Sequence, residues 1–219
     1  MSRDIIYTVS DKIDSNPVLW LSADKNITLN GNNVSAWGDR SGNGYNATQS
    51  TPANQPLYVP NALNGNPGIL FDGVNDFLSL SNTLSLNTQT YFCVVNYNHV
   101  GGTQNVHLIG GTLYDGYQIN IGGSLFVNNS SFGGIGDYSN TNILFSSVRK
   151  VDGIYTIFVD GVQKATQYST PMELNVIAKR GSNDIFSSCY MYEIIIYNSA
   201  LSDSQRQSVE NYLKQKYNL

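Results

Sequence analysis

The sequence predicts an all-β fold, an antiparallel β-sandwich with one C-terminal α-helix. Short runs of β-branched and aromatic residues recur along the chain, turn pairs such as Asp-Gly and Gly-Gly separate many of them, and one amphipathic stretch closes the sequence. Such runs favour strands, and Asp-Gly favours a tight hairpin because glycine accepts a positive φ. Only 13% of the 219 residues are charged. Asn, Ser, Thr, Gly and Tyr replace the usual helix-forming Lys and Glu, which disfavours a mostly helical protein.

The predicted strands follow one another at short intervals, as in a sandwich or jelly roll. They are residues 18–21, 34–37, 68–71, 77–80, 88–97, 106–109, 117–121, 124–127, 143–148, 154–159, 162–168, 174–178 and 190–197. The clearest hairpin is formed by residues 154–162, where Asp160-Gly161 joins two apolar runs. No stretch has the composition of a linker, so residues 17–219 are expected to form one domain.

The last stretch has the marks of a helix start and of an amphipathic helix. Ser202 and Gln205 have capping-box spacing, and Asp203 favours the positive end of the helix dipole. The apolar stripe is expected to dock onto the sandwich, because the stretch lacks the basic face of a membrane-surface helix. That stripe consists of Val209, Tyr212, Leu213 and Tyr217, and the charged residues assigned to the other face are Arg206, Glu210, Lys214 and Lys216.

Charge and composition exclude several classes of function. The formal net charge is -4, and the densest basic spots are only pairs, Arg149-Lys150 and Lys179-Arg180. A nucleic-acid surface needs a basic patch or stripe, so no nucleic-acid partner is expected. No apolar run approaches the roughly 20 residues that a spanning helix needs. Cys93 and Cys189 lie in strand-like runs and are expected to be buried hydrophobes, with a disulfide between them as the alternative; the sequence offers no ligand set for zinc.

Residues 1–16 are expected to form an N-terminal arm that contacts another protein or a second copy of the chain. Ile5, Ile6 and Val9 give this arm strand character, but its start lacks the apolar region of a secretory signal. Two interpretations follow. Either the protein is made and used without classical export, or a signal has been removed and the protein is extracellular.

Three segments together resemble a known family. They are residues 17–24 with 34–47, residues 67–78, and residues 193–198 with the terminal helix. They contain the motifs Trp-x-Asp-x-Ser-Gly-x-Gly from Trp37 and Phe-Asp-Gly from Phe71. In this order they resemble the laminin-G-like, concanavalin A-like lectin/glucanase jelly rolls of phage virion proteins and bacterial surface proteins. The resemblance implies a jelly roll over residues 17–219. It implies less about the ligand, because this fold hosts lectins, hydrolases and structural modules.

The loops between Gly110 and Asn140 are the predicted ligand site. Aromatic faces pack on sugar C–H patches, and amides or carboxylates bond to hydroxyls. The candidate residues are Tyr114, Asp115, Tyr117, Asn128, Phe132, Asp137 and Tyr138. The motif at residues 37–47 is interpreted as structural instead, with Asp39 and Ser41 accepting bonds from the loop's own N–H groups.

Asp72, Asn75 and Asp76 place three oxygen-bearing side chains on one turn, as a calcium site requires. The resemblance strengthens this candidate, since related jelly rolls carry calcium. An Asp-Gly hairpin needs no metal, however, and no calcium-loop pattern is present. Both interpretations stay open, and no other cofactor is expected.

The sequence favours binding over catalysis. The glucanase branch of the resembling family has Glu-x-Asp-x-x-Glu on one strand, whereas this chain has only Glu173, Glu193 and Glu210, none in that motif. The expected function is a non-catalytic binding or structural protein, on a phage virion surface as a head decoration, fibre or adhesion module. Glycans, other virion proteins or a second copy are the expected partners. The alternatives are a bacterial carbohydrate-binding module of a secreted protein, and a glycoside hydrolase or lyase.

Overall fold

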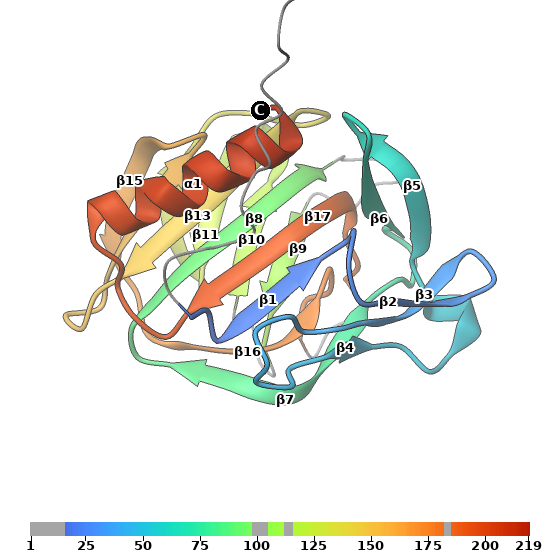
Figure 1. Ribbon diagram of the computed structural model, residues 1–219. Helices are drawn as coiled ribbons and strands as arrows, with labels where there is room; N and C mark the ends of the chain where they lie inside the picture. Colours follow the sequence, from blue (N-terminus) through green and yellow to red (C-terminus); the bar gives the residue numbers. More distant parts are fainter. Residues whose placement is uncertain (1–15, 98–104, 112–115, 182–184) are drawn as a thin grey trace, which may run out of the picture.

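The computed structural model describes residues 16–97, 105–111, 116–181 and 185–219, and these form two packed antiparallel sheets with one α-helix (Figure 1). The helix-side sheet contains β1 (Leu19–Ser22), β6 (Asn66–Asp72), β17 (Ser188–Tyr197), β8 (Gln89–Tyr97), β13 (Asn142–Arg149), β14 (Ile154–Val159) and β15 (Val162–Tyr168). β17 pairs with β1 and β6 along one edge and with β8 along the other. β13, β14 and β15 then follow β8 in order. The predicted sandwich is confirmed.

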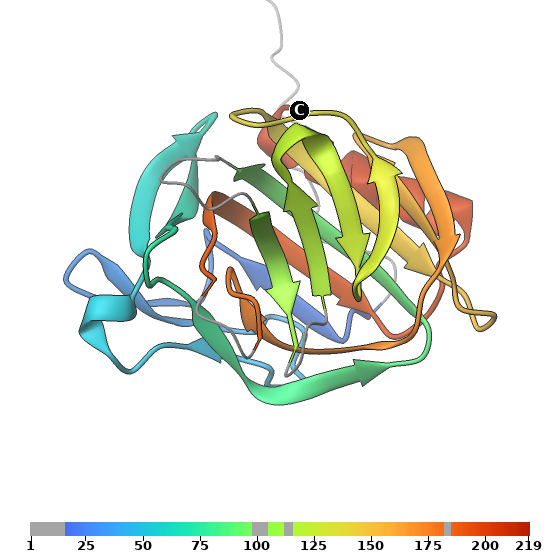
Figure 2. The same ribbon diagram turned by 180° about the vertical axis from the view of Figure 1, so that it is seen from behind.

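The far sheet lies on the other side of the core, and Figure 2 shows its outward face. It contains β4 (Ala47–Thr48), β7 (Leu78–Leu86), β16 (Met172–Ile177), β9 (Asn105–Gly110), β10 (Gly116–Asn120), β11 (Ser124–Val127) and β12 (Ser130–Gly134), paired in that order. The connecting elements are β2 (Ile27–Asn30), β3 (Asn33–Trp37), β5 (Leu57–Leu63) and two short 3-10 turns, η1 (Pro52–Asn54) and η3 (Ile121–Gly123).

Strands β2, β4, β5 and β12 were not predicted, and β7 runs to Leu86 rather than ending at residue 80. These segments lack the apolar pattern of an isolated strand. β5 contains Pro60, and β12 has the sequence Ser-Ser-Phe-Gly-Gly. Each gains its strand structure from pairing with a neighbour, which local sequence does not reveal.

The two sheets enclose the main core, and the helix covers a second one. Tyr91 and Cys93 of β8 point between the sheets. Phe92 and Val94 of the same strand point outward, toward the helix. Because both faces of this strand are covered at its centre, residues 91–95 are continuously apolar rather than alternating. Cys93 and Cys189 are both buried and unbonded, as predicted.

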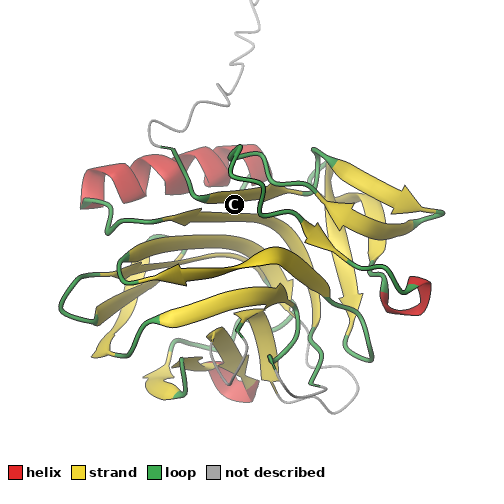
Figure 3. Cartoon of the chain, turned by 90° about the horizontal axis from the view of Figure 1, so that it is seen from below, coloured by secondary structure: helices red, strands yellow, loops and turns green. Residues whose placement is uncertain are grey.

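The helix α1 (Asp203–Tyr217) lies across the outward face of the helix-side sheet (Figure 3). Ser202 and Gln205 form the predicted capping box, and all four residues of the apolar stripe are buried. Within the described residues no helix is long and apolar enough to span a bilayer.

The assignment of Arg206 and Glu210 to the charged, outward side of α1 is wrong, because both are buried. Arg206 Nη1 donates to both carboxylate oxygens of Glu210 at 2.6 Å, and Ser146 Oγ donates to Glu210 at 2.7 Å. The guanidinium also lies 3.8 Å from the centre of the Phe158 ring. β13 and β14 therefore supply the partners that let a buried ion pair face the sheet.

Glu193 also belongs to the helix–sheet contact. Its carboxylate accepts hydrogen bonds from Trp20 Nε1 at 2.6 Å, from Lys216 Nζ at 2.8 Å and from Tyr217 OH at 2.8 Å. These bonds join β17, β1 and the end of α1. Glu193 is therefore a structural anchor for the helix.

The motif at residues 37–47 is structural, as predicted. Asp39 accepts bonds from Ser41 N at 2.9 Å and from Tyr45 N at 3.0 Å. It also accepts a bond from Trp20 N at 3.0 Å. The loop thereby covers the outer edge of β1, whose N–H and C=O groups would otherwise be unpaired.

Candidate functional site

Two of the predicted ligand residues lie inside the core. Tyr117 is fully buried, and its ring stacks on Tyr91 with centroids 4.6 Å apart. Phe132 is also buried and packs edge-on against Tyr155. Their assignment to a ligand surface is wrong, because alternation along β10 and β12 turns both rings inward. Tyr114 and Asp115 lie outside the described residues.

The remaining predicted residues do not converge on one site. Asn128, in the β11–β12 turn, donates to Thr170 Oγ1 and to Pro171 O, the latter at 3.2 Å. Asp137 and Tyr138 follow β12, beyond the opposite end of β11. A four-residue strand spans roughly 13 Å, so the two groups are separated along the sheet. Tyr138 N donates to Tyr97 OH at 3.0 Å, and Asp137 accepts from Ser139 N at 3.0 Å.

The predicted calcium turn is held by its own backbone. Asp72 Oδ1 accepts from Val74 N at 2.8 Å and from Asn75 N at 3.3 Å. Asp76 Oδ2 accepts from Asp72 N at 3.1 Å. In the part of the chain that the structure describes, no three His, Cys, Asp or Glu side chains are grouped to hold a metal ion. The carboxylates of Asp72 and Asp76 thus accept hydrogen bonds from the backbone of the turn itself.

Asp76 provides a testable pH effect at this turn. Burial, and then the neighbouring Asp72 carboxylate, raise the pKa of Asp76 from 3.8 to about 6. The protonated form therefore favours the folded state, and this contribution is lost as pH rises through about 6. A carbon-13 NMR titration of the Asp76 carboxyl should give a midpoint near this value, and Asp72→Asn should lower it. An ordinary midpoint would contradict the geometry of the turn.

The titration must be resolved by residue, because His107 changes the free energy of unfolding with pH in the opposite direction to Asp76. Burial, and then the charge of Arg180, lower the pKa of His107 to about 4. Its neutral form favours the folded state, and this contribution is lost as pH falls through about 4. The two effects oppose one another in the free energy of unfolding between about pH 4 and pH 6.

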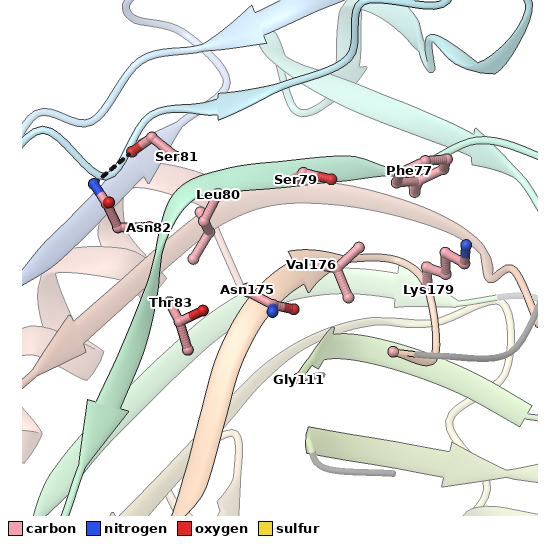
Figure 4. Close-up of a pocket in the computed structure, with 11 residues that line it drawn as sticks. Phe77, Ser79, Leu80, Ser81, Asn82, Thr83, Gly111, Asn175, Val176 and Lys179 are labelled. Carbon is pink, nitrogen blue, oxygen red and sulfur yellow. Dashed lines mark hydrogen bonds between the residues drawn. The ribbon is translucent and has the colours of Figure 1, made fainter. Parts of the chain in front are cut away.

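An open pocket with a volume of about 570 Å³ lies on the outward face of the far sheet (Figure 4). Its wall is mostly uncharged and polar. The residues that line it are Phe77, Ser79, Leu80, Ser81, Asn82, Thr83, Gly111, Asn175, Val176, Lys179 and Gly181. We call this the arch pocket.

An irregularity in strand pairing opens the arch pocket. Leu174 of β16 pairs with Leu84 of β7, and Val176 pairs with Ser79. Residues 80–83 of β7 therefore oppose Asn175 alone, and the longer strand bends away from its partner. Figure 4 shows β7 passing over Asn175 in this bend. The sheet thus surrounds one amide with hydroxyl and amide side chains.

Phe77 and Lys179 line one end of the arch pocket, and the ring of Phe186 packs against both. Phe77 and Phe186 are half-buried, with ring centroids 6.0 Å apart. Lys179 Nζ lies 4.8 Å from the centre of the Phe77 ring and 5.2 Å from that of Phe186. An isolated bridge between Lys179 and Phe186 fixes this arrangement. The pocket therefore combines an apolar surface with hydrogen-bonding side chains, the combination that polyhydroxylated ligands require.

Sequence reasoning missed this site. Phe77 was taken only as the start of a strand, and Lys179 only as half of a basic pair. Asn175 was the one available signal, since an amide interrupts the apolar run of residues 174–178.

No protein-family model matches the sequence, and no curated protein matches it. Several solved structures match the fold of the chain. Trypanosoma rangeli sialidase in complex with sialic acid has a TM-score of 0.64 at 16% identity, over 93% of this chain and 34% of that one. The binding domain of Paraclostridial Mosquitocidal Protein 1 has a TM-score of 0.65 at 13% identity, over 92% of this chain and 53% of that one.

A third match is the botulinum neurotoxin serotype D ligand binding domain in complex with N-acetylneuraminic acid. Its TM-score is 0.60 at 15% identity, over 90% of this chain and 50% of that one. The matched structures share the β-sandwich fold of this chain. At such low identities the likeness is one of fold, and this chain spans about a third to a half of the matched structures.

Proposed function

We propose that this domain binds carbohydrate without altering it chemically, and that the arch pocket is its binding site. The observation that carries the proposal is the placement of Asn175 at the bend of β7, in the same pocket as the Phe77 ring. Amide and hydroxyl groups bond to sugar hydroxyls, while an aromatic ring packs on the apolar face of the sugar. Two of the matched structures are complexes with sialic acid or N-acetylneuraminic acid, which makes sialic acid the first ligand to test.

The chemistry of the pocket supports binding rather than hydrolysis. Glycoside hydrolysis generally uses a pair of carboxyl groups on either side of the scissile bond. Among the described residues that line the arch pocket, none has a carboxyl, imidazole or thiol group. The carboxylates of Glu193 and Glu210 accept hydrogen bonds in the contact between α1 and the helix-side sheet.

The proposed setting is the surface of a phage particle, as the resemblance at residues 17–78 and 193–219 implies. A bacterial carbohydrate-binding module is the alternative. Neighbouring genes for phage structural proteins would favour the first setting, and neighbouring glycosidase genes the second.

A glycan array that contains sialylated and neutral glycans tests the proposal. We expect selective binding of the intact domain to at least one glycan class. Mass spectrometry after prolonged incubation should then recover the bound glycan unchanged. Absence of binding across the array, or release of a cleaved product, would contradict the proposed function.

A further inference from the structure

A second polar and aromatic surface lies on the opposite side of the sandwich from the arch pocket. In the helix-side sheet, Tyr190 of β17 pairs with Asn96 of β8, and Asn96 pairs with Asn142 of β13. The three residues form one row across three strands, and each is half-buried. We call them the Tyr190 row. This end of β17 lies between the end of α1 and the β5–β6 hairpin (Figure 1).

The ring of Tyr190 is supported by a buried ring. It lies parallel to Tyr192, with centroids 6.3 Å apart and an interplanar angle of 8°. Tyr192 is fixed by a bond from its OH to Asn142 Oδ1 at 3.0 Å and by contact with Tyr217. β6 also lies close against it, since a Cβ built on Gly68 would stand 2.8 Å from the Tyr192 ring. A supported aromatic ring loses little conformational entropy when a ligand covers it.

The two amides of the Tyr190 row are aligned by one shared acceptor. Asn96 Nδ2 donates to Asn142 Oδ1 at 3.1 Å, and Tyr192 OH donates to the same oxygen. Asn142 Nδ2 and Asn96 Oδ1 have no hydrogen-bond partner among the described residues. One donor and one acceptor thus stand side by side next to an aromatic ring. Adjacent hydroxyls of a pyranose, each both donor and acceptor, complement this pair.

We propose that the Tyr190 row is a second carbohydrate site, which takes a neutral pyranose with two adjacent hydroxyls. The inference rests on the proposed function, that the domain binds carbohydrate. The Tyr190 row differs from the arch pocket in location and in the ligand chemistry that it favours. The row contains no charged side chain, whereas the arch pocket includes Lys179. Two sites on opposite faces let one domain hold two glycan chains at once.

The test is a proton–nitrogen NMR titration of the whole chain with methyl β-D-galactopyranoside, methyl β-D-glucopyranoside and methyl α-D-mannopyranoside. Side-chain amide signals separate the two sites, because Asn96 and Asn142 report on the row and Asn175 on the arch pocket. We expect at least one glycoside to shift the Asn96 and Asn142 signals in a saturable way.

Variants then test the geometry. Tyr190→Ala and Asn142→Asp should each weaken this binding by about tenfold, since the first removes the ring and the second replaces the Nδ2 donor of Asn142 with an acceptor. Tyr190→Phe keeps the ring and should retain wild-type affinity. Tyr168→Ala, which removes an exposed tyrosine of β15, is the matched control and should have no effect.

The outcomes separate the two proposals. Shifts at Asn175 alone would overturn the second site and leave the proposed function standing. Shifts at Asn96 and Asn142 alone would support the row and move the proposed function away from the arch pocket. No shift at either site with any of the three glycosides overturns the second site, as does an unchanged affinity in both Tyr190→Ala and Asn142→Asp.

Discussion

Replacing Leu213 by alanine is expected to lower the free energy of unfolding by about 2–5 kcal/mol, through lost burial and the cavity left behind. Leu213 is fully buried between α1 and the helix-side sheet, in the cluster that contains Phe92 and Ile195. Denaturant unfolding measures the change. Gln215→Ala, at an exposed position of the same helix, is the control and should change stability by about 0.5 kcal/mol or less. A similarly small effect of Leu213→Ala would show that α1 does not pack on the sheet.

Glu210→Ala is expected to cost a comparable amount, about 3–5 kcal/mol, because it leaves a buried charge without its partner. Arg206 is buried over Phe158, and its Nη1 bonds to both oxygens of Glu210. The double variant Arg206→Met with Glu210→Leu removes both charges and should recover most of that loss. If Glu210→Ala alone leaves the unfolding free energy unchanged, the ion pair does not form in the protein.

Local signals predicted the fold well. The capping box at Ser202 and Gln205 requires only residues three positions apart, and the helix begins there. Asp160 and Gly161 both have positive φ in the β14–β15 hairpin, at 51° and 79°. In each case the interacting groups are close in sequence, so composition and spacing suffice.

The candidate site depends on contacts between residues that are far apart in the sequence. For this reason the sequence did not predict its location. Tyr117 and Tyr190 are both strand tyrosines, yet the first is buried and the second half-exposed, a difference set by which sheet face each occupies. The arch pocket arises from a mismatch between β7 and β16, about ninety residues apart in the sequence. No local pattern encodes that mismatch, because strand register depends on the partner strand.

The affinity of the Asn175→Ala and Phe77→Ala variants for the strongest array ligand, measured by calorimetry, tests the central claim most directly. The claim is that the arch pocket binds carbohydrate. Each variant should bind about tenfold more weakly or worse, while the midpoint of unfolding stays near that of the wild type. The Tyr168→Ala control should bind normally. Wild-type affinity in both pocket variants would contradict the account.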